Sequence, residues 1–184
     1  TNIKYLKEVK KHLKKHKIKK YKIVLEPAKR NTGPAILSAA LIKDIPNDQS
    51  LLFLSADHLI EQKKIFLNEI KKNKKYLTNN NIFIFGIKPT VSSSEYGYFL
   101  TKKKNKFNKV IKFIEKPNQL IAKKIIRQKG YWNSGIFFLK KISIINNFKK
   151  YQLSAYKNCL KAVKKSKYKK NTYHLNKQAF IKNV

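Results

Sequence analysis

Hydrophobic and polar positions form alternating blocks along the first half of the chain, and each block predicts one helix or strand. Over residues 3–16, apolar side chains recur at helical spacing, which predicts an amphipathic helix with a lysine-rich outer face. Two runs without polar residues are typical of strands that are buried on both faces of a sheet. Strands are predicted at 21–25, 51–54 and 82–85, and helices at 3–16, 34–41 and 61–75.

The order of these elements predicts the fold class. Alternating helices and strands favour an α/β fold with a doubly wound, mostly parallel, Rossmann-like sheet and right-handed crossovers. Ligands bind such sheets at the carboxyl ends of the strands. The loops after Leu25, Leu54 and Gly86 follow predicted strands. We therefore expect these loops to gather at the ligand-binding edge of one sheet.

The second half of the chain is richer in predicted strands. A polar turn at 102–108 separates two of them, and Gly130 is suited to end the helix that precedes the last one. Beyond Lys140 the lysine-rich chain is expected to be helical. The predicted strands are 98–101, 110–114 and 136–139, and the predicted helix is 118–129.

Length and composition fit one domain with a sizeable core, since the chain has 184 residues of which 42% are hydrophobic. It contains no run of about 18 apolar residues, so no membrane span is predicted. It starts without the apolar segment of a signal peptide, and Cys159 is the only cysteine, which excludes an internal disulfide. We therefore expect a cytoplasmic protein with no membrane partner.

The formal net charge of +35 raises the alternative of a nucleic-acid-binding module. Arginine is the residue expected at bidentate phosphate and guanine contacts, yet Arg30 and Arg127 are the only arginines among 44 basic residues. The lysines are also spread along the whole chain, and abundant lysine, asparagine and isoleucine are what an AT-rich genome encodes. We expect no specific nucleic-acid partner, although the charge attracts anionic substrates.

Residues suited to chemistry gather in five short strings. Asp57 follows a predicted buried strand, where a carboxylate can hold Mg²⁺, a cation that prefers oxygen ligands; capping of the next helix is the competing interpretation. His58 beside it is expected to have a structural role. The strings are Glu26-Pro27-Ala28-Lys29-Arg30-Asn31-Thr32-Gly33-Pro34-Ala35, Ser55-Ala56-Asp57-His58, Tyr96-Gly97-Tyr98, Glu115-Lys116-Pro117 and Trp132-Asn133-Ser134-Gly135.

The first string suits a nucleotide. Glu26 ends a predicted strand and precedes Pro27, which favours an extended turn. A carboxylate only accepts hydrogen bonds, and guanine presents a ring N–H and an exocyclic amine side by side, so one carboxylate can read both. A surface glutamate paired with a lysine is the competing interpretation. Arg30, Asn31 and Thr32 precede a predicted helix whose N-terminus suits nucleotide phosphate or ribose, while Thr32 also suits a helix cap.

The last three strings suit a phosphorylated sugar. Gly97 lets the backbone approach a ligand closely, Glu115 suits sugar hydroxyls and Lys116 suits the sugar phosphate. Asn133 offers an amide that both donates and accepts hydrogen bonds, and Trp132 is expected to pack in the core. An ordinary strand start and a surface lysine are the competing interpretations of Gly97 and Lys116.

In this order and at these separations, the five strings resemble the nucleotidyltransferase domain of the mannose-1-phosphate guanylyltransferase family, over about residues 21–139. The resemblance implies transfer of GMP from GTP to mannose 1-phosphate, with GDP-mannose and pyrophosphate as products and Mg²⁺ as cofactor. It implies that Asp57 binds the metal and acts in catalysis with Lys116. Nucleotide contacts are implied for Glu26, Pro27, Arg30, Asn31 and Thr32, and sugar-phosphate contacts for Gly97, Glu115, Lys116 and Asn133.

The chain also departs from the family pattern. Ser55 stands where the family has proline, Lys29 where it has glycine and Gly33 where it has alanine. The family's N-terminal Gly-rich phosphate loop and its second metal-binding aspartate have no counterpart, and the chain contains no methionine. We therefore expect residues 1–184 to be an internal part of one nucleotidyltransferase domain, with a sheet incomplete at both ends and no activity alone.

Three alternatives stay open from the sequence. The first is a nucleotidyltransferase for another sugar phosphate or base, because sugar choice rests on few residues. The second is a basic nucleic-acid-binding module, which predicts a steep dependence of binding on salt. The third is a degenerate homologue without catalytic activity. Homo-oligomerisation is also left open.

Overall fold

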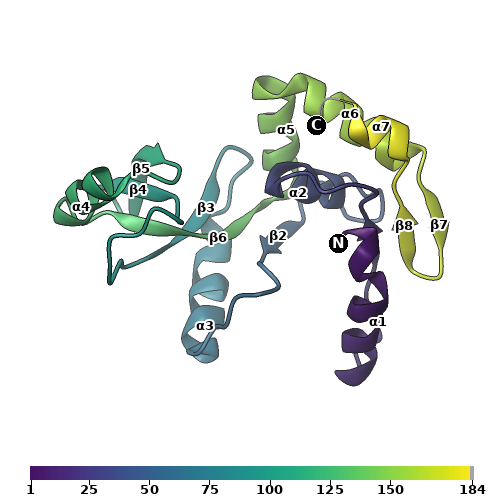
Figure 1. Cartoon of the computed structure of the whole chain (residues 1–184), viewed down its shortest axis with the longest axis horizontal. Helices are drawn as coiled ribbons and strands as arrows, with labels where there is room; N and C mark the ends of the chain where they lie inside the picture. Colours follow the sequence, from purple (N-terminus) through teal and green to yellow (C-terminus); the bar gives the residue numbers. More distant parts are fainter. Residues whose placement is uncertain (183–184) are drawn as a thin grey trace. The chain divides into compact units, whose positions relative to one another are not determined.

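The computed structural model describes residues 1–182, which form two compact units (Figure 1). Unit 1 comprises Thr1–Ser50, Thr78–Asn81 and the described residues from Leu139 onward, and unit 2 comprises Leu51–Leu77 and Ile82–Phe138. Each unit contains both helices and strands, so the predicted α/β class is confirmed.

Unit 1 is built from helices and a small mixed sheet. Strand β1 pairs in parallel with β8, with Val24 opposite Tyr173, and β8 pairs antiparallel with β7. Helix α2 packs on α5 and α6, and α6 packs on α7, which buries Leu37 and Phe180 completely. The elements are η1 (Ile3–Tyr5), α1 (Leu6–Lys15), β1 (Ile23–Leu25), α2 (Thr32–Ala40), α5 (Lys141–Tyr151), α6 (Leu153–Lys164), β7 (Lys167–Lys169), β8 (Thr172–His174) and α7 (Lys177–Ile181).

Unit 2 is built around a five-stranded sheet with the order β2-β6-β4-β5, in which β3 also pairs with β6. The β4–β5 and β4–β6 pairings are antiparallel. Tyr98, Ala122 and Ile125 form the buried cluster of this unit, and Trp132 packs against it as predicted. The elements are β2 (Ser50–Phe53), α3 (Lys63–Asn73), η2 (Lys74–Tyr76), β3 (Ile82–Ile87), β4 (Tyr98–Lys104), β5 (Phe107–Ile114), α4 (Gln119–Arg127) and β6 (Tyr131–Lys140).

The backbone geometry at the C-terminus of α4 explains why Gly130 follows this helix. Lys129 adopts the left-handed conformation (φ 57°), and its N–H and that of Gly130 donate to the carbonyls of Ile126 and Ile125, both at 2.9 Å. These bonds form a Schellman motif. Gly130 is needed for space, because a Cβ there would lie 2.3 Å from Cγ2 of Ile125.

Four predictions about the fold are wrong in part. Strand β1 pairs with β8 and not with β2 or β3, so the loops after Leu25 and Leu54 leave different sheets. The chain beyond Lys140 contains the β7–β8 hairpin as well as helices, and β3 continues through Gly86 to Ile87. The predicted polar turn at 102–108 is mostly strand, because β4 and β5 pair as far as Lys104 and Phe107.

Candidate nucleotide and sugar-phosphate sites

Glu26 is the candidate guanine reader, and it lies where β1 ends in unit 1. Its backbone bridges to the N-terminal segment: its N–H donates to the carbonyl of Thr1 (2.8 Å), and its carbonyl accepts from the N–H of Ile3 (3.1 Å). The Oε1 atom of Glu26 is buried and has no hydrogen-bond partner among the described residues. Burial raises the pKa of this carboxyl. A buried acceptor without a donor is costly, so this oxygen is well suited to a ligand that brings N–H groups.

Arg30 lies four residues further along the same segment and is held by the end of α7. Its Nη2 donates to the carbonyl of Ile181 at 2.9 Å. Its Nε is buried and lacks an acceptor within the described part of the chain. One face of the guanidinium is therefore anchored by protein, while Nε keeps an unused donor for a phosphate or carbonyl oxygen.

Asn31 and Thr32 stand at the start of α2 and are exposed. Asn31 occupies the N-cap position without forming a capping hydrogen bond through its side chain, and Thr32 is the first helical residue. The prediction that Thr32 caps this helix is therefore wrong, because the helix begins one residue earlier than a Thr32 cap requires. Without a side-chain cap, the first N–H groups of α2 suit a bound anion. Pro27, partly buried, leads into this segment.

Asp57 is the candidate metal ligand, and it lies in the loop after β2 in unit 2. Its side chain is 88% exposed, and Nε2 of His58 lies 4.0 Å from its Oδ1. Among residues 1–182 no three histidine, cysteine, aspartate or glutamate residues lie close enough to form a complete metal site. Mg²⁺ usually takes one or two carboxylates and completes its shell with water and substrate phosphates. A lone exposed carboxylate fits that pattern.

The residues expected to bind the sugar phosphate meet at the start of β4. Tyr98 of β4 pairs with Ile114 of β5, which sets Gly97 beside Glu115, and a Cβ on Gly97 would lie 2.6 Å from Oε2 of Glu115. The carbonyl of Gly97 accepts from the N–H of Asn133 at 2.8 Å. Gly97, Glu115 and Asn133 are thus brought together, with the Glu115 carboxylate exposed.

Lys116 and Trp132 flank this group. Lys116 is exposed and adopts a left-handed conformation (φ 42°), which is uncommon for a residue with a long side chain. Nε1 of Trp132 is buried with no acceptor in the described chain, and its ring lies 4.9 Å from that of Tyr96. The unpaired indole N–H could not be predicted from the sequence, because core packing is a sufficient explanation for a single tryptophan.

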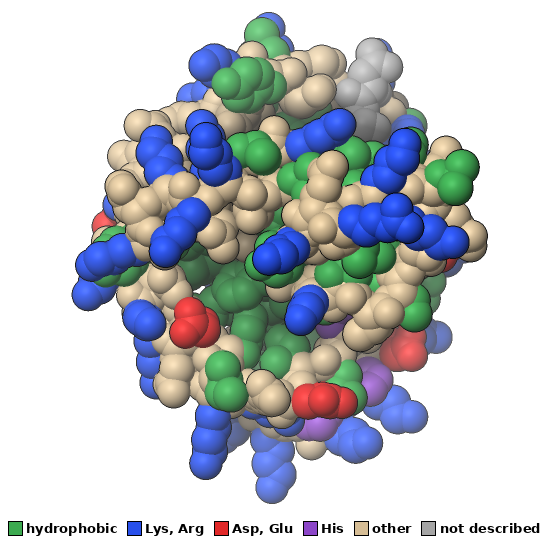
Figure 2. Space-filling model, turned by 90° about the vertical axis from the view of Figure 1, so that its left-hand side faces the viewer, with side chains coloured by type: hydrophobic (Ala, Val, Ile, Leu, Met, Phe, Trp, Pro, Cys, Tyr) green, Lys and Arg blue, Asp and Glu red, His purple; other side chains and the backbone are tan. Residues whose placement is uncertain are grey.

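The basic side chains bear on the alternative of a nucleic-acid-binding module. On the face drawn in Figure 2, lysine and arginine side chains are distributed over most of the surface. This distribution matches the expectation from the sequence, where lysines occur along the entire chain. Within the described part of the chain, no helix is both long and apolar enough to cross a bilayer.

A solved structure with a similar fold indicates the class of protein. The fold matches the crystal structure of mannose-6-phosphate isomerase from Helicobacter pylori with a TM-score of 0.84 and 25% identity, covering 97% of this chain and 70% of that one. The match shows that the chain shares the α/β fold of that sugar-phosphate enzyme.

Sequence relatives identify the family within this fold class. A mannose-1-phosphate guanylyltransferase from Salmonella muenchen is 36% identical over 148 residues, covering 77% of this chain and 31% of the relative. One from Escherichia coli is 35% identical over 168 residues, which cover 86% of this chain and 36% of the relative. The model of the nucleotidyl transferase family matches residues 1–179, so the chain belongs to this family. It spans about a third of the length of these relatives.

Proposed function

We propose that the protein containing this chain is a mannose-1-phosphate guanylyltransferase. In this reaction a phosphate oxygen of mannose 1-phosphate forms a bond to the α-phosphorus of GTP. The bond from that phosphorus to the bridging oxygen of the β-phosphate breaks, so GDP-mannose forms and pyrophosphate leaves. No covalent intermediate on the enzyme is needed, and positioning and charge neutralisation supply the catalysis.

The observation that carries this proposal is the buried, unpaired Oε1 of Glu26. Guanine offers two adjacent N–H donors to such a carboxylate, and adenine lacks that pair. The same segment continues into Arg30, with an unused Nε donor, and into the uncapped N-terminus of α2, which suits an anion. The names of the relatives support the same substrates.

The group in unit 2 supports the sugar half of the reaction. Glu115 and Asn133 supply a carboxylate and an amide on either side of Gly97, which suits the hydroxyl groups of mannose. Lys116 supplies an ammonium for the sugar phosphate. Asp57 would hold Mg²⁺, which when bound neutralises phosphate charge and orients the triphosphate. The proposed location of the reaction is the cytoplasm.

The decisive experiment measures pyrophosphate release by the complete reading frame that encodes this chain. Mg²⁺, mannose 1-phosphate and each of the four nucleoside triphosphates are supplied, and Asp57→Asn and Glu26→Gln are compared with the exposed controls Asp48→Asn and Glu61→Gln. We expect GTP-selective release that is lost in Asp57→Asn and loses its preference for GTP in Glu26→Gln. Release that is equal for all four nucleotides, or none from a folded protein, would overturn the proposal.

A further inference from the structure

A cavity in unit 1 lies apart in sequence from every residue assigned above. It has a volume of about 380 Å³ and is lined by Leu41, Lys43, Ile45, Pro46, Asn47, Lys141 and Ile145. Its lining contains two ammonium groups and one amide but no carboxylate. The volume lies within the range of small-molecule sites, about 300–1,000 Å³.

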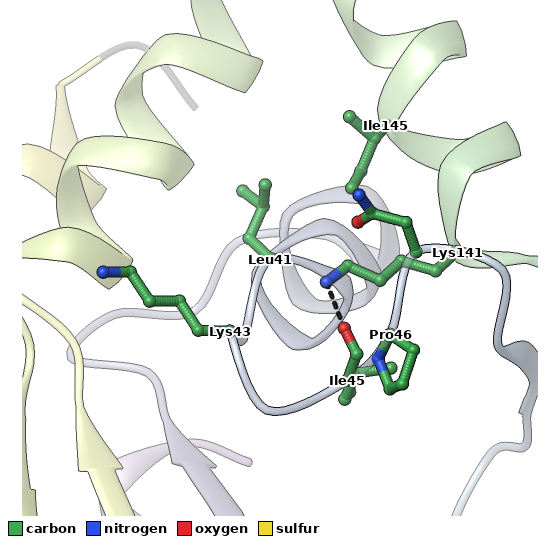
Figure 3. A pocket seen from close by; sticks show the side chains of 7 residues that line it. Leu41, Lys43, Ile45, Pro46, Lys141 and Ile145 are labelled. Carbon is green, nitrogen blue, oxygen red and sulfur yellow. Dashed lines mark hydrogen bonds between the residues drawn. The ribbon is translucent and has the colours of Figure 1, made fainter.

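Lys141 is the unusual residue of this cavity, because only 5% of its surface is exposed. Its Nζ donates to the carbonyls of Ile45 (2.6 Å) and Ile42 (3.2 Å). Figure 3 shows the side chain reaching across to Ile45. An ammonium carries three donors, so one remains beyond these two bonds. No carboxylate lies within 4.0 Å of this nitrogen in the described chain.

The burial of this cation leaves its charge poorly compensated. Two neutral carbonyls are weaker partners than an anion, and a buried charge without a counterion is costly. Desolvation lowers the pKa of Lys141, as expected for an ammonium in such surroundings. An anion in the adjoining cavity would supply the missing charge.

Backbone hydrogen bonds join the two chain segments that line the cavity. The N–H of Lys141 donates to the carbonyl of Gln49 (2.9 Å), and the N–H of Ile142 donates to that of Asn47 (3.1 Å). Lys43 is exposed, and in Figure 3 its side chain points away from Lys141. Its free side chain can turn toward a bound anion, whereas Lys141 is already in place.

We propose that this cavity binds a small phosphate-bearing anion, with Lys141 as the fixed cation and Lys43 as the mobile one. Ammonium groups bind phosphate as point charges. The apolar side chains of Leu41, Ile45, Pro46 and Ile145 would border the remainder of the ligand. This site is separate from the proposed reaction: α2 begins at Thr32 in the nucleotide segment and ends before Leu41, about 13 Å along its axis for nine residues.

The test is a titration of the protein with inorganic phosphate and, separately, with phenyl phosphate at constant ionic strength. Amide chemical shifts locate binding, and calorimetry measures affinity. We expect saturable shifts at residues 41–47 and 141–145 that persist when the proposed nucleotide and sugar-phosphate residues Arg30 and Lys116 are replaced by Gln. Equal affinity for both probes would identify free phosphate as the ligand, and tighter binding of phenyl phosphate a phosphomonoester. Either result supports the site.

Variants separate a binding role from a structural one. Lys141→Met should weaken binding by about tenfold or more, and Lys43→Gln by about two- to fivefold. Lys164→Gln, an exposed lysine outside the cavity, removes the same charge and should change nothing. If Lys141→Met does not fold, the difference in phosphate affinity between Lys43→Gln and Lys164→Gln still tests the proposal. Shifts that do not saturate, or that are the same in Lys43→Gln and Lys164→Gln, would show that Lys141 only fastens the loop at 42–45.

Discussion

Glu26 and Arg30 of unit 1 carry buried polar atoms, whereas most candidate residues of unit 2 face solvent. Oε1 of Glu26 and Nε of Arg30 are buried and without partners among residues 1–182. By contrast, 88% of the Asp57 side chain is exposed, and Glu115 and Lys116 are exposed as well. Substitutions in unit 1 should therefore change stability together with binding, while those in unit 2 should change function alone.

The largest effect is expected at Asp57. Asp57→Asn should reduce the proposed guanylyltransferase activity of the complete protein by at least about 100-fold, as removal of a key electrostatic group does. Its stability should stay the same, because an exposed carboxylate whose partner is the exposed His58 imidazole at 4.0 Å contributes little to folding. Steady-state pyrophosphate release and thermal unfolding measure the two quantities. A clear fall in melting temperature would contradict the contrast between the units.

Gly97 is the exception in unit 2, because its substitution should change stability as well as function. A Cβ there would lie 2.6 Å from Oε2 of Glu115 and 3.0 Å from Cζ of Phe113. Gly97→Ala should displace the carboxylate and raise the KM for mannose 1-phosphate. Because the exposed end of Glu115 can move aside, the loss of stability should stay below the roughly 1–3 kcal/mol of a typical overpacked core.

Gly33 of unit 1 is the matched position, and its substitution by alanine should raise stability where that of Gly97 lowers it. Gly33 lies in the first turn of α2, where the closest atom to an added Cβ would be Cζ of Phe148, at 3.3 Å. If the ring shifts slightly, Gly33→Ala should stabilise the helix by about 0.5–1 kcal/mol. Urea unfolding of both alanine variants gives the comparison directly. A loss of stability in Gly33→Ala would mean that Phe148 cannot move.

The pH dependence of stability should reveal the burial of Glu26. Because desolvation raises the pKa of this carboxyl above 4.5, the folded chain holds the proton more tightly than the unfolded chain. Stability from this group is complete below pH 4.5 and declines as the pH rises through the folded-state pKa. Glu26→Gln should remove this decline and leave the chain more stable at neutral pH, with Glu61→Gln as an exposed control. Unfolding in urea between pH 4 and 8 tests both variants.

The smallest effect is expected at the surface network of Lys22, Asp44 and Tyr173 in unit 1. The hydroxyl of Tyr173 donates to Oδ2 of Asp44 at 2.7 Å, which raises the pKa of Tyr173 to about 12. The stability that this bond contributes is complete below pH 10.0 and is lost between pH 10.0 and about 12. Tyr173→Phe should destabilise slightly at pH 8 and make no difference at high pH.

The sequence predicts the local elements well because periodicity depends on near neighbours. The hairpin at 167–174 escaped prediction, since its strands are polar and its turn lacks the usual glycine. Lys170 and Asn171 both adopt positive φ (47° and 59°), the pattern of a type I′ turn, which Asn-Gly usually forms. The pairing of β1 with β8 joins segments about 150 residues apart, as Val24 opposite Tyr173 shows, and no local pattern reveals it.

Which candidate residues lie close together is predictable from the sequence only where their strands are neighbours in the chain. The motif at Gly97, Glu115 and Asn133 forms one group because β4 and β5 are adjacent in the chain. The burial of Glu26 depends on the N-terminal segment bridging to it, which the residue pattern does not specify. Lys141 could not have been singled out, because one lysine among so many carries no signal until its burial is known.

The division into units has a consequence for how this chain can be cut, fused or recombined. The backbone passes from one unit to the other after residues 50, 77, 81 and 138, and β6 begins in unit 2 and ends in unit 1. Because the units are interleaved along the chain, no single cleavage or gene fusion point separates unit 1 from unit 2. A recombined gene that exchanges either half would have to keep four junctions in register, so we expect the two halves to be inherited together.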